Sequence, residues 1–127
     1  MFSNVSFDLD MAKDDNSPMG LAHDRLNRIL NALARYSYHA SLNKNETMEF
    51  PQDFDESIGG QCLILDAYVK NGQGLEINNR QFGLMLAINI HRSEMEFARK
   101  NGGETLLELL KKKGIYPYSN LDRNPVV

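Results

Sequence analysis

Hydrophobic and polar residues alternate with different periods along the chain, and these periods predict where helices and strands form. Between residues 18 and 42, apolar residues recur at spacings of three and four, which is typical of the buried face of a helix. Ser17 and Pro18 stand at its start, where serine is a favoured cap and proline suits the first helical position. The sequence therefore predicts a helix over 18–42.

The most apolar stretch of the chain predicts a long central helix over 78–101. Asn78 or Asn79 can cap its first turn, and the Asn-Gly-Gly run at 101–103 is typical of a helix end. The first half has almost no polar face, so we expect other elements to surround it, whereas the second half is amphipathic. A shorter helix rich in leucine and lysine is expected over 104–113.

The segment 53–71 carries two conflicting signals. Its apolar residues follow a helical period, and Asp53 can cap their start. The pair Gly59-Gly60 weakens a helix by about 1 kcal/mol per glycine relative to alanine, and the apolar run within 61–69 also suits a central strand. We favour the helix, with a strand over 61–69 as the alternative.

Residues 5–11 alternate strictly between apolar and polar side chains, which predicts a half-buried N-terminal strand. Together the segments predict a mainly α fold, in which a compact bundle of about four helices surrounds the central one. If residues 61–69 form a strand, the fold class becomes α+β instead. The expected helices are 18–42, 53–71, 78–101 and 104–113.

Length and composition indicate an ordinary globular protein. The 127 residues suit one domain, 1–127, and residues 119–127 are expected to fray at its end. Cys62 is the only cysteine and lies in an apolar run, so we interpret it as core filler in a reducing compartment. No run approaches the roughly 18 apolar residues of a membrane span, and the N-terminus lacks the basic start of a secretory signal. We therefore expect a cytoplasmic protein.

The sequence carries no motif for catalysis, metal binding or cofactor binding. His23, His39 and His91 share no zinc-binding spacing, and no phosphate-binding glycine loop or nucleophile elbow occurs. His91 and Glu94 lie one helical turn apart, and a surface hydrogen bond is the simplest interpretation of this pair. The basic residues are scattered apart from lysines 111–113, which argues against nucleic-acid binding. We predict no cofactor and no metal.

Charge is distributed unevenly along the chain. The net charge of −3 divides into −5 over residues 1–60, with ten acids and five bases, and +2 over residues 61–127. Several of these acids crowd into one polar connection, and a negative surface steers association with a basic partner. The alternative is that they only keep a loop soluble. The predicted partner-binding residues are Glu46, Glu49, Asp53, Asp55 and Glu56.

The favoured hypothesis is a small acidic binding protein without catalytic activity. It would inhibit or neutralise a basic protein partner, such as a toxin or a nuclease, as an immunity protein, an antitoxin or a phage-type inhibitor does. A second hypothesis is a small helical enzyme whose site is assembled in space around His39, His91 and Asn89. A third is a homo-oligomeric structural module, in which strand 5–11 pairs with the same strand of a second copy to form a homodimer.

Overall fold

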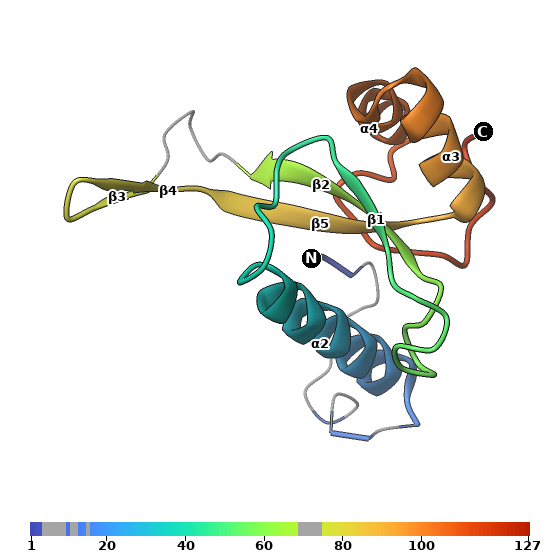
Figure 1. Ribbon diagram of the computed structural model, residues 1–127. Helices are drawn as coiled ribbons and strands as arrows, with labels where there is room; N and C mark the ends of the chain where they lie inside the picture. The colour runs from blue at the N-terminus through green and yellow to red at the C-terminus, as the bar shows by residue number, and fades with distance from the viewer. Residues whose placement is uncertain (4–9, 11–12, 15, 69–74) are drawn as a thin grey trace.

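The computed structural model describes residues 1–3, 10, 13–14, 16–68 and 75–127 of the chain. Within this part, the helices are α2 (Pro18–Tyr36), α3 (Arg92–Asn101) and α4 (Gly103–Lys112), and the main sheet consists of β1 (Thr47–Glu49), β2 (Cys62–Tyr68) and β5 (Leu84–Ile90). The sheet is antiparallel in the order β1-β2-β5, with α2 on one face and α3 and α4 on the other (Figure 1). This is an α+β fold, so the prediction of a mainly α bundle of four helices is wrong.

The central strand β2 lies where the sequence favoured a helix over 53–71. Its first five residues are all buried, because both faces of the sheet are covered by helices. Leu63 belongs to the core on the α2 side, whereas Ile64 belongs to the core on the α3 and α4 side. A strand that is covered on both faces is apolar at successive positions, which hides its period of two. The helix over 53–71 is therefore wrong, and the alternative strand over 61–69 agrees with β2.

The predicted central helix over 78–101 is also wrong in its first half. The apolar residues there form β5, which pairs antiparallel with β2 along its whole length. The chain then turns at His91, and only the amphipathic second half forms a helix, α3. An apolar run without polar positions has no visible period, so the pairing with β2 decides that it is a strand.

A separate two-stranded hairpin precedes β5 and projects away from the body of the molecule (Figure 1). It consists of β3 (Leu75–Ile77) and β4 (Arg80–Phe82). Asn78 and Asn79 form its two-residue turn with φ angles of 52° and 61°. Such left-handed pairs match the twist of a hairpin, and asparagine tolerates them better than most residues. The two asparagines are therefore turn residues and not the predicted helix cap.

Two hydrophobic cores lie on the two faces of the sheet. The predicted core position of Cys62 is confirmed, since the residue is 2% exposed, and burial raises the pKa of its thiol. The core on the α2 side contains Ile29, Ala32, Leu33, Phe50, Ile58, Leu63, Leu65 and Ala87. The core on the α3 and α4 side contains Cys62, Ile64, Leu86, Ile88, Ile90, Met95, Ala98, Leu106, Leu107 and Leu110.

The first and last predicted helices are present. The Oγ of Ser17 accepts a hydrogen bond from the backbone N–H of Gly20 at 3.0 Å, so the predicted cap of α2 is confirmed. α2 ends at Tyr36, earlier than the predicted end at residue 42, and the chain continues in turns. α4 agrees with the predicted helix over 104–113 to within a residue at each end.

The C-terminal tail returns to the N-terminus of α3. Arg123 donates two hydrogen bonds to the carboxylate of Glu94, at 2.6 and 2.8 Å, and the backbone N–H of Val126 donates a third at 2.9 Å. The backbone N–H of His91 donates to the same carboxylate at 2.8 Å. Glu94 is fully buried, so the predicted surface hydrogen bond with His91 is wrong. The glutamate instead joins the tail, 119–127, to the first turn of α3.

Tyr116, which precedes the tail, contacts β2 through Asp66. Its hydroxyl donates to the Oδ2 of Asp66 at 3.0 Å, and Asp66 is itself 8% exposed. Burial and then this hydrogen bond raise the pKa of Tyr116 to about 12. Lys111 lies with its Nζ 3.8 Å from the same carboxylate oxygen and 4.6 Å from the centre of the tyrosine ring. Asp66, a buried acid of the central strand β2, thus has a hydrogen bond from Tyr116 and an ion pair with Lys111.

The predicted N-terminal strand over 5–11 lies almost entirely outside the described residues, and so does the dimer contact that was predicted to use it. Among the helices of the described part, none combines the length and the apolar character required to cross a membrane.

Candidate functional site

The five predicted acids lie in the connection from α2 to β2, which contains β1. Glu46 directly precedes β1 and Glu49 ends it, whereas Asp53, Asp55 and Glu56 follow in the loop that leads to β2. The five acids therefore share one connection but not one face of the sheet, since Glu49 contacts Arg92 of α3 and Asp55 contacts Arg28 of α2. The partner-binding role of these acids stays a prediction.

The five carboxylates differ in what they contact. Glu49 forms an ion pair with Arg92 of α3. Asp55 lies 3.4 Å from the guanidinium of Arg28 on α2. Both acids therefore help to join the connection to a helix, and their negative charge is offset by an arginine.

Asp53 and Glu56 are the least constrained of the acids. Both are exposed, and neither forms an ion pair or side-chain hydrogen bond within the part of the chain that the structure describes. Glu46 is also exposed, and among the residues that the structure describes only Asn43 donates hydrogen bonds to its carboxylate, through its backbone and side chain. These three acids therefore carry charge that no described arginine or lysine offsets.

Neighbouring groups shift the pKa of Asp55 and of the two arginines that pair with the connection. Hydrogen bonds from the hydroxyl and the backbone N–H of Ser57 lower the pKa of Asp55, and Arg28 lowers it further. In turn, the hydrogen bond and charge of Asp24 raise the pKa of Arg28, and those of Glu49 raise the pKa of Arg92. These pKa shifts favour the ionised forms of Asp55, Arg28 and Arg92.

An apolar groove lies between the end of α2 and β1, and Glu49 is the acid among its lining residues, whereas Asp53 precedes the lining residue Phe54 in the sequence. It has a volume of about 470 Å³. Phe50 and Phe54 stack with their ring centres 5.7 Å apart, and Phe54 remains 53% exposed. Tyr36 is 48% exposed at the other side. The apolar lining consists of Ala32, Tyr36, Met48, Phe50, Pro51 and Phe54.

We call the groove together with Glu46, Asp53 and Glu56 the acidic–apolar surface. An apolar centre with large exposed aromatic rings and a charged rim is the usual composition of a protein-binding site. The sequence pattern indicated the acids but missed the groove, because its residues come from α2 and from the connection. Phe50-Pro51 was visible only as an apolar interruption of a polar stretch.

The residues of the alternative enzyme site are not brought together. His39 is exposed in the turns after α2, whereas His91 precedes α3 and its Nε2 lies 2.9 Å from the carbonyl oxygen of Arg123. Asn89 is buried in β5, where its Nδ2 donates to the Oε1 of Gln61 at 2.6 Å. Among the described residues, no group of three or more histidines, cysteines, aspartates or glutamates is suited to a metal ion.

The family model of "Suppressor of fused protein (SUFU)" matches residues 12–124, which is most of the chain. The chain belongs to this family. The SUFU match indicates a protein-interaction domain, so the general prediction of a protein-binding function is confirmed. The SUFU match extends over the sheet, the three helices and the whole acidic–apolar surface. No curated protein and no solved structure matches the chain.

Proposed function

We propose that this SUFU-family chain inhibits or neutralises a basic protein partner by binding it on the acidic–apolar surface, and that it has no catalytic step of its own. The role corresponds to that of an immunity protein, an antitoxin or a phage-type inhibitor. The proposal is supported by an apolar groove with exposed aromatic rings whose connection to β2 also carries three exposed acids that no described cation neutralises.

The two halves of this surface have separate physical roles. The unpaired charges of Glu46, Asp53 and Glu56 raise the association rate with a positively charged partner, and salt screens this effect. Burial of the rings of Tyr36 and Phe54 supplies contact energy once the partner is bound, because aromatic anchors dominate many interfaces. Glu49 and Asp55, which were also predicted to bind the partner, already form ion pairs with Arg92 and Arg28. We assign these two acids a supporting role.

The charge contribution can be tested by removing only the three unpaired acids. In an affinity pull-down from the native cell lysate, wild type should retain a stoichiometric basic partner at low salt and less of it at high salt. We expect Glu46→Gln/Asp53→Asn/Glu56→Gln to bind that purified partner at least about tenfold more weakly at low salt, since rim charges chiefly change the association rate.

A matched control carries the same change of net charge on the opposite side of the sheet. Glu96→Gln/Glu104→Gln/Glu108→Gln alters exposed acids of α3 and α4 that form no ion pair among the described residues. The control should bind like wild type. Equal weakening in both variants would indicate a general effect of charge and contradict the assignment of the surface. The purified partner must also lose its activity when one equivalent of wild type is added, or the inhibitory role is wrong.

The apolar contribution is tested by Phe54→Ala. Because the ring is 53% exposed in the free protein, its removal should change the melting temperature little. We expect the affinity for the same partner to fall by about tenfold or more at both low and high salt, as for an aromatic anchor. Tyr38→Ala, at an 89% exposed ring outside the groove, is the control and should leave the affinity unchanged.

A further inference from the structure

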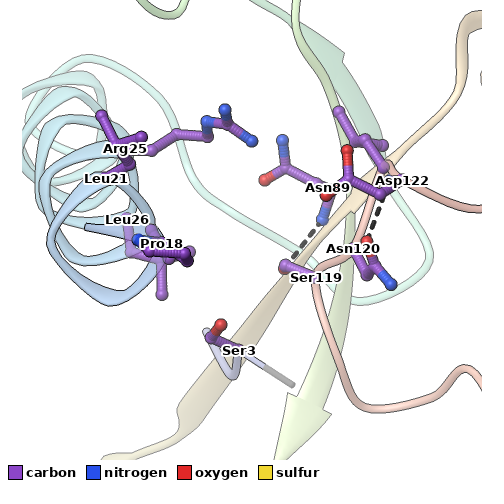
Figure 2. Close-up of a pocket in the computed structure, with 11 residues that line it drawn as sticks. Ser3, Pro18, Leu21, Arg25, Leu26, Asn89, Ser119, Asn120 and Asp122 are labelled. Atoms are coloured by element: carbon purple, nitrogen blue, oxygen red, sulfur yellow. Dashed lines mark hydrogen bonds between the residues drawn. The ribbon is translucent and has the colours of Figure 1, made fainter. Parts of the chain in front are cut away.

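A second cavity lies at the other half of α2, remote from the groove, and no function has been assigned to it. It has a volume of about 290 Å³ and lies between the first half of α2, β5 and the C-terminal tail (Figure 2). Leu21, Leu26 and Leu121 contribute to its apolar wall. The volume is near the lower end of the range of about 300–1,000 Å³ that is typical of ligand sites. A small group is therefore the expected occupant.

Asn89 supplies an unused hydrogen-bond acceptor to this cavity. The residue is 3% exposed, its Nδ2 donates to Gln61, and its backbone N–H donates to the Oγ of Ser119 at 3.1 Å. Its Oδ1 has no hydrogen-bond partner within the described part of the chain. Figure 2 shows the side-chain amide directed from β5 into the space before α2. A buried carbonyl oxygen without a donor is unfavourable, so a ligand N–H would be stabilised there.

Arg25 supplies the positive charge. In Figure 2 its guanidinium extends from α2 toward the amide of Asn89. Arg28, one turn later on the same helix, pairs with Asp24 and Asp55, whereas no ion pair of Arg25 occurs among the described residues. A free guanidinium recognises a carboxylate through two parallel N–H donors. The hydroxyl of Ser119 accepts from Asn89 through its oxygen and keeps its hydrogen for a further acceptor.

The three features together select one kind of ligand. A carboxylate fits the donors of Arg25 and Ser119, a neighbouring N–H fits the Oδ1 of Asn89, and an apolar side chain fits the leucine wall. We propose that this cavity binds an α-amino-carboxylate residue with an apolar side chain. Its source is either a free amino acid or the last residue of a polypeptide. The inference does not depend on the acidic–apolar surface, which lies at the other half of α2.

Asp122 provides a way to distinguish a free amino acid from the last residue of a polypeptide. Asp122 is one of the residues that line the same cavity, and a nearby carboxylate favours a ligand nitrogen that carries a positive charge. A free amino acid presents such an ammonium group, whereas a chain terminus presents a neutral amide N–H. Leucine should therefore bind more tightly than N-acetyl-leucine if the natural ligand is a free amino acid, and more weakly if it is a chain terminus.

In the experiment, each ligand is titrated into the ¹⁵N-labelled full chain. Binding is monitored through the backbone amide signals of Asn89 and Ser119. Leucine or N-acetyl-leucine should shift both signals saturably. N-acetyl-leucinamide, which lacks the carboxylate, and 4-methylpentanoate, which lacks the nitrogen, should each bind at least about tenfold more weakly, as expected for loss of one charged or buried hydrogen bond.

Two variants complete the test. Arg25→Met should weaken binding at least about tenfold without lowering the melting temperature, because Arg25 is exposed and forms no ion pair with the described residues. Arg35→Met changes an exposed arginine at the end of the same helix, outside the cavity, and should bind like wild type. The inference is overturned if no ligand shifts these signals up to about 10 mM, or if removing the carboxylate or Arg25 leaves the affinity unchanged.

Discussion

Replacement of Glu94 by glutamine should destabilise the protein by about 3–5 kcal/mol, because it leaves the guanidinium of Arg123 buried without its counter-charge. The Glu94 side chain is fully buried, and that of Arg123 is 11% exposed. Two N–H groups of Arg123 and the backbone N–H groups of His91 and Val126 donate to the carboxylate. Urea denaturation of Glu94→Gln at neutral pH measures the loss.

The double variant Glu94→Gln/Arg123→Met separates charge from packing. With both charges removed, no buried ion remains unpaired, so more than half of the lost free energy of unfolding should return. A double variant that is as unstable as Glu94→Gln would show that the charge pair is unimportant. A loss below about 1 kcal/mol in Glu94→Gln would contradict its burial.

The same pair predicts a sensitivity to acid. Burial by itself would raise the pKa of Glu94, but hydrogen bonds from Arg123, Val126 and His91 hold it below the ordinary value of 4.5. Because the pKa is lower in the folded state, the pair's contribution is fully present above the unfolded pKa. It is lost as the pH falls through the folded pKa. Wild type should therefore lose stability below about pH 4.5 more steeply than Glu94→Gln.

Leu63→Ala and Ile64→Ala should each cost about 2–5 kcal/mol, although the two residues are neighbours in the sequence. Both are fully buried, because one packs in the core on the α2 side and the other in the core on the α3 and α4 side. If residues 53–71 formed the helix that the sequence favoured, Leu63 would lie off its apolar stripe and its truncation would cost little. Thermal and urea denaturation of the two variants distinguish the arrangements.

Leu84→Ala is the control for these truncations. The residue begins β5, but its side chain is 55% exposed. Its truncation removes little buried area and should cost less than about 1 kcal/mol. If Leu63→Ala cost no more than this control, the two-sided burial of β2 would be wrong.

Local signals were sufficient for the elements whose ends are marked by their own side chains. The cap of Ser17 and the position of Pro18 predicted the start of α2, because a serine oxygen satisfies an N–H that no tertiary contact needs to supply. α4 was predicted for a similar reason, since its leucines follow a helical period and its lysines lie in the last turn, where positive charge complements the helix dipole. The apolar setting of Cys62 and the general function as a protein-binding domain were also visible in the sequence.

Tertiary structure decided the elements that are buried on all sides. The apolar runs within β2 and β5 have no polar face, so their period cannot be read, and only their mutual pairing between two layers of helices makes them strands. Because the segment before β5 pairs as a hairpin and does not begin a helix, Asn78 and Asn79 form a turn and not a helix cap. Glu94 likewise looked like a surface acid, because its partner Arg123 is remote in the sequence.

The candidate sites divide in the same way. Acidic residues that lie close together in the sequence are predictable from it, because a polar connection is exposed in almost any fold. The groove beside them joins Tyr36 of α2 to Phe54 of the loop, and the second cavity joins Arg25 of α2 to Asn89 of β5. The sequence by itself determined the chain's acidic character and its end helices. Only the packing of α2 against the sheet created the cavities, since their walls come from segments that no local pattern relates.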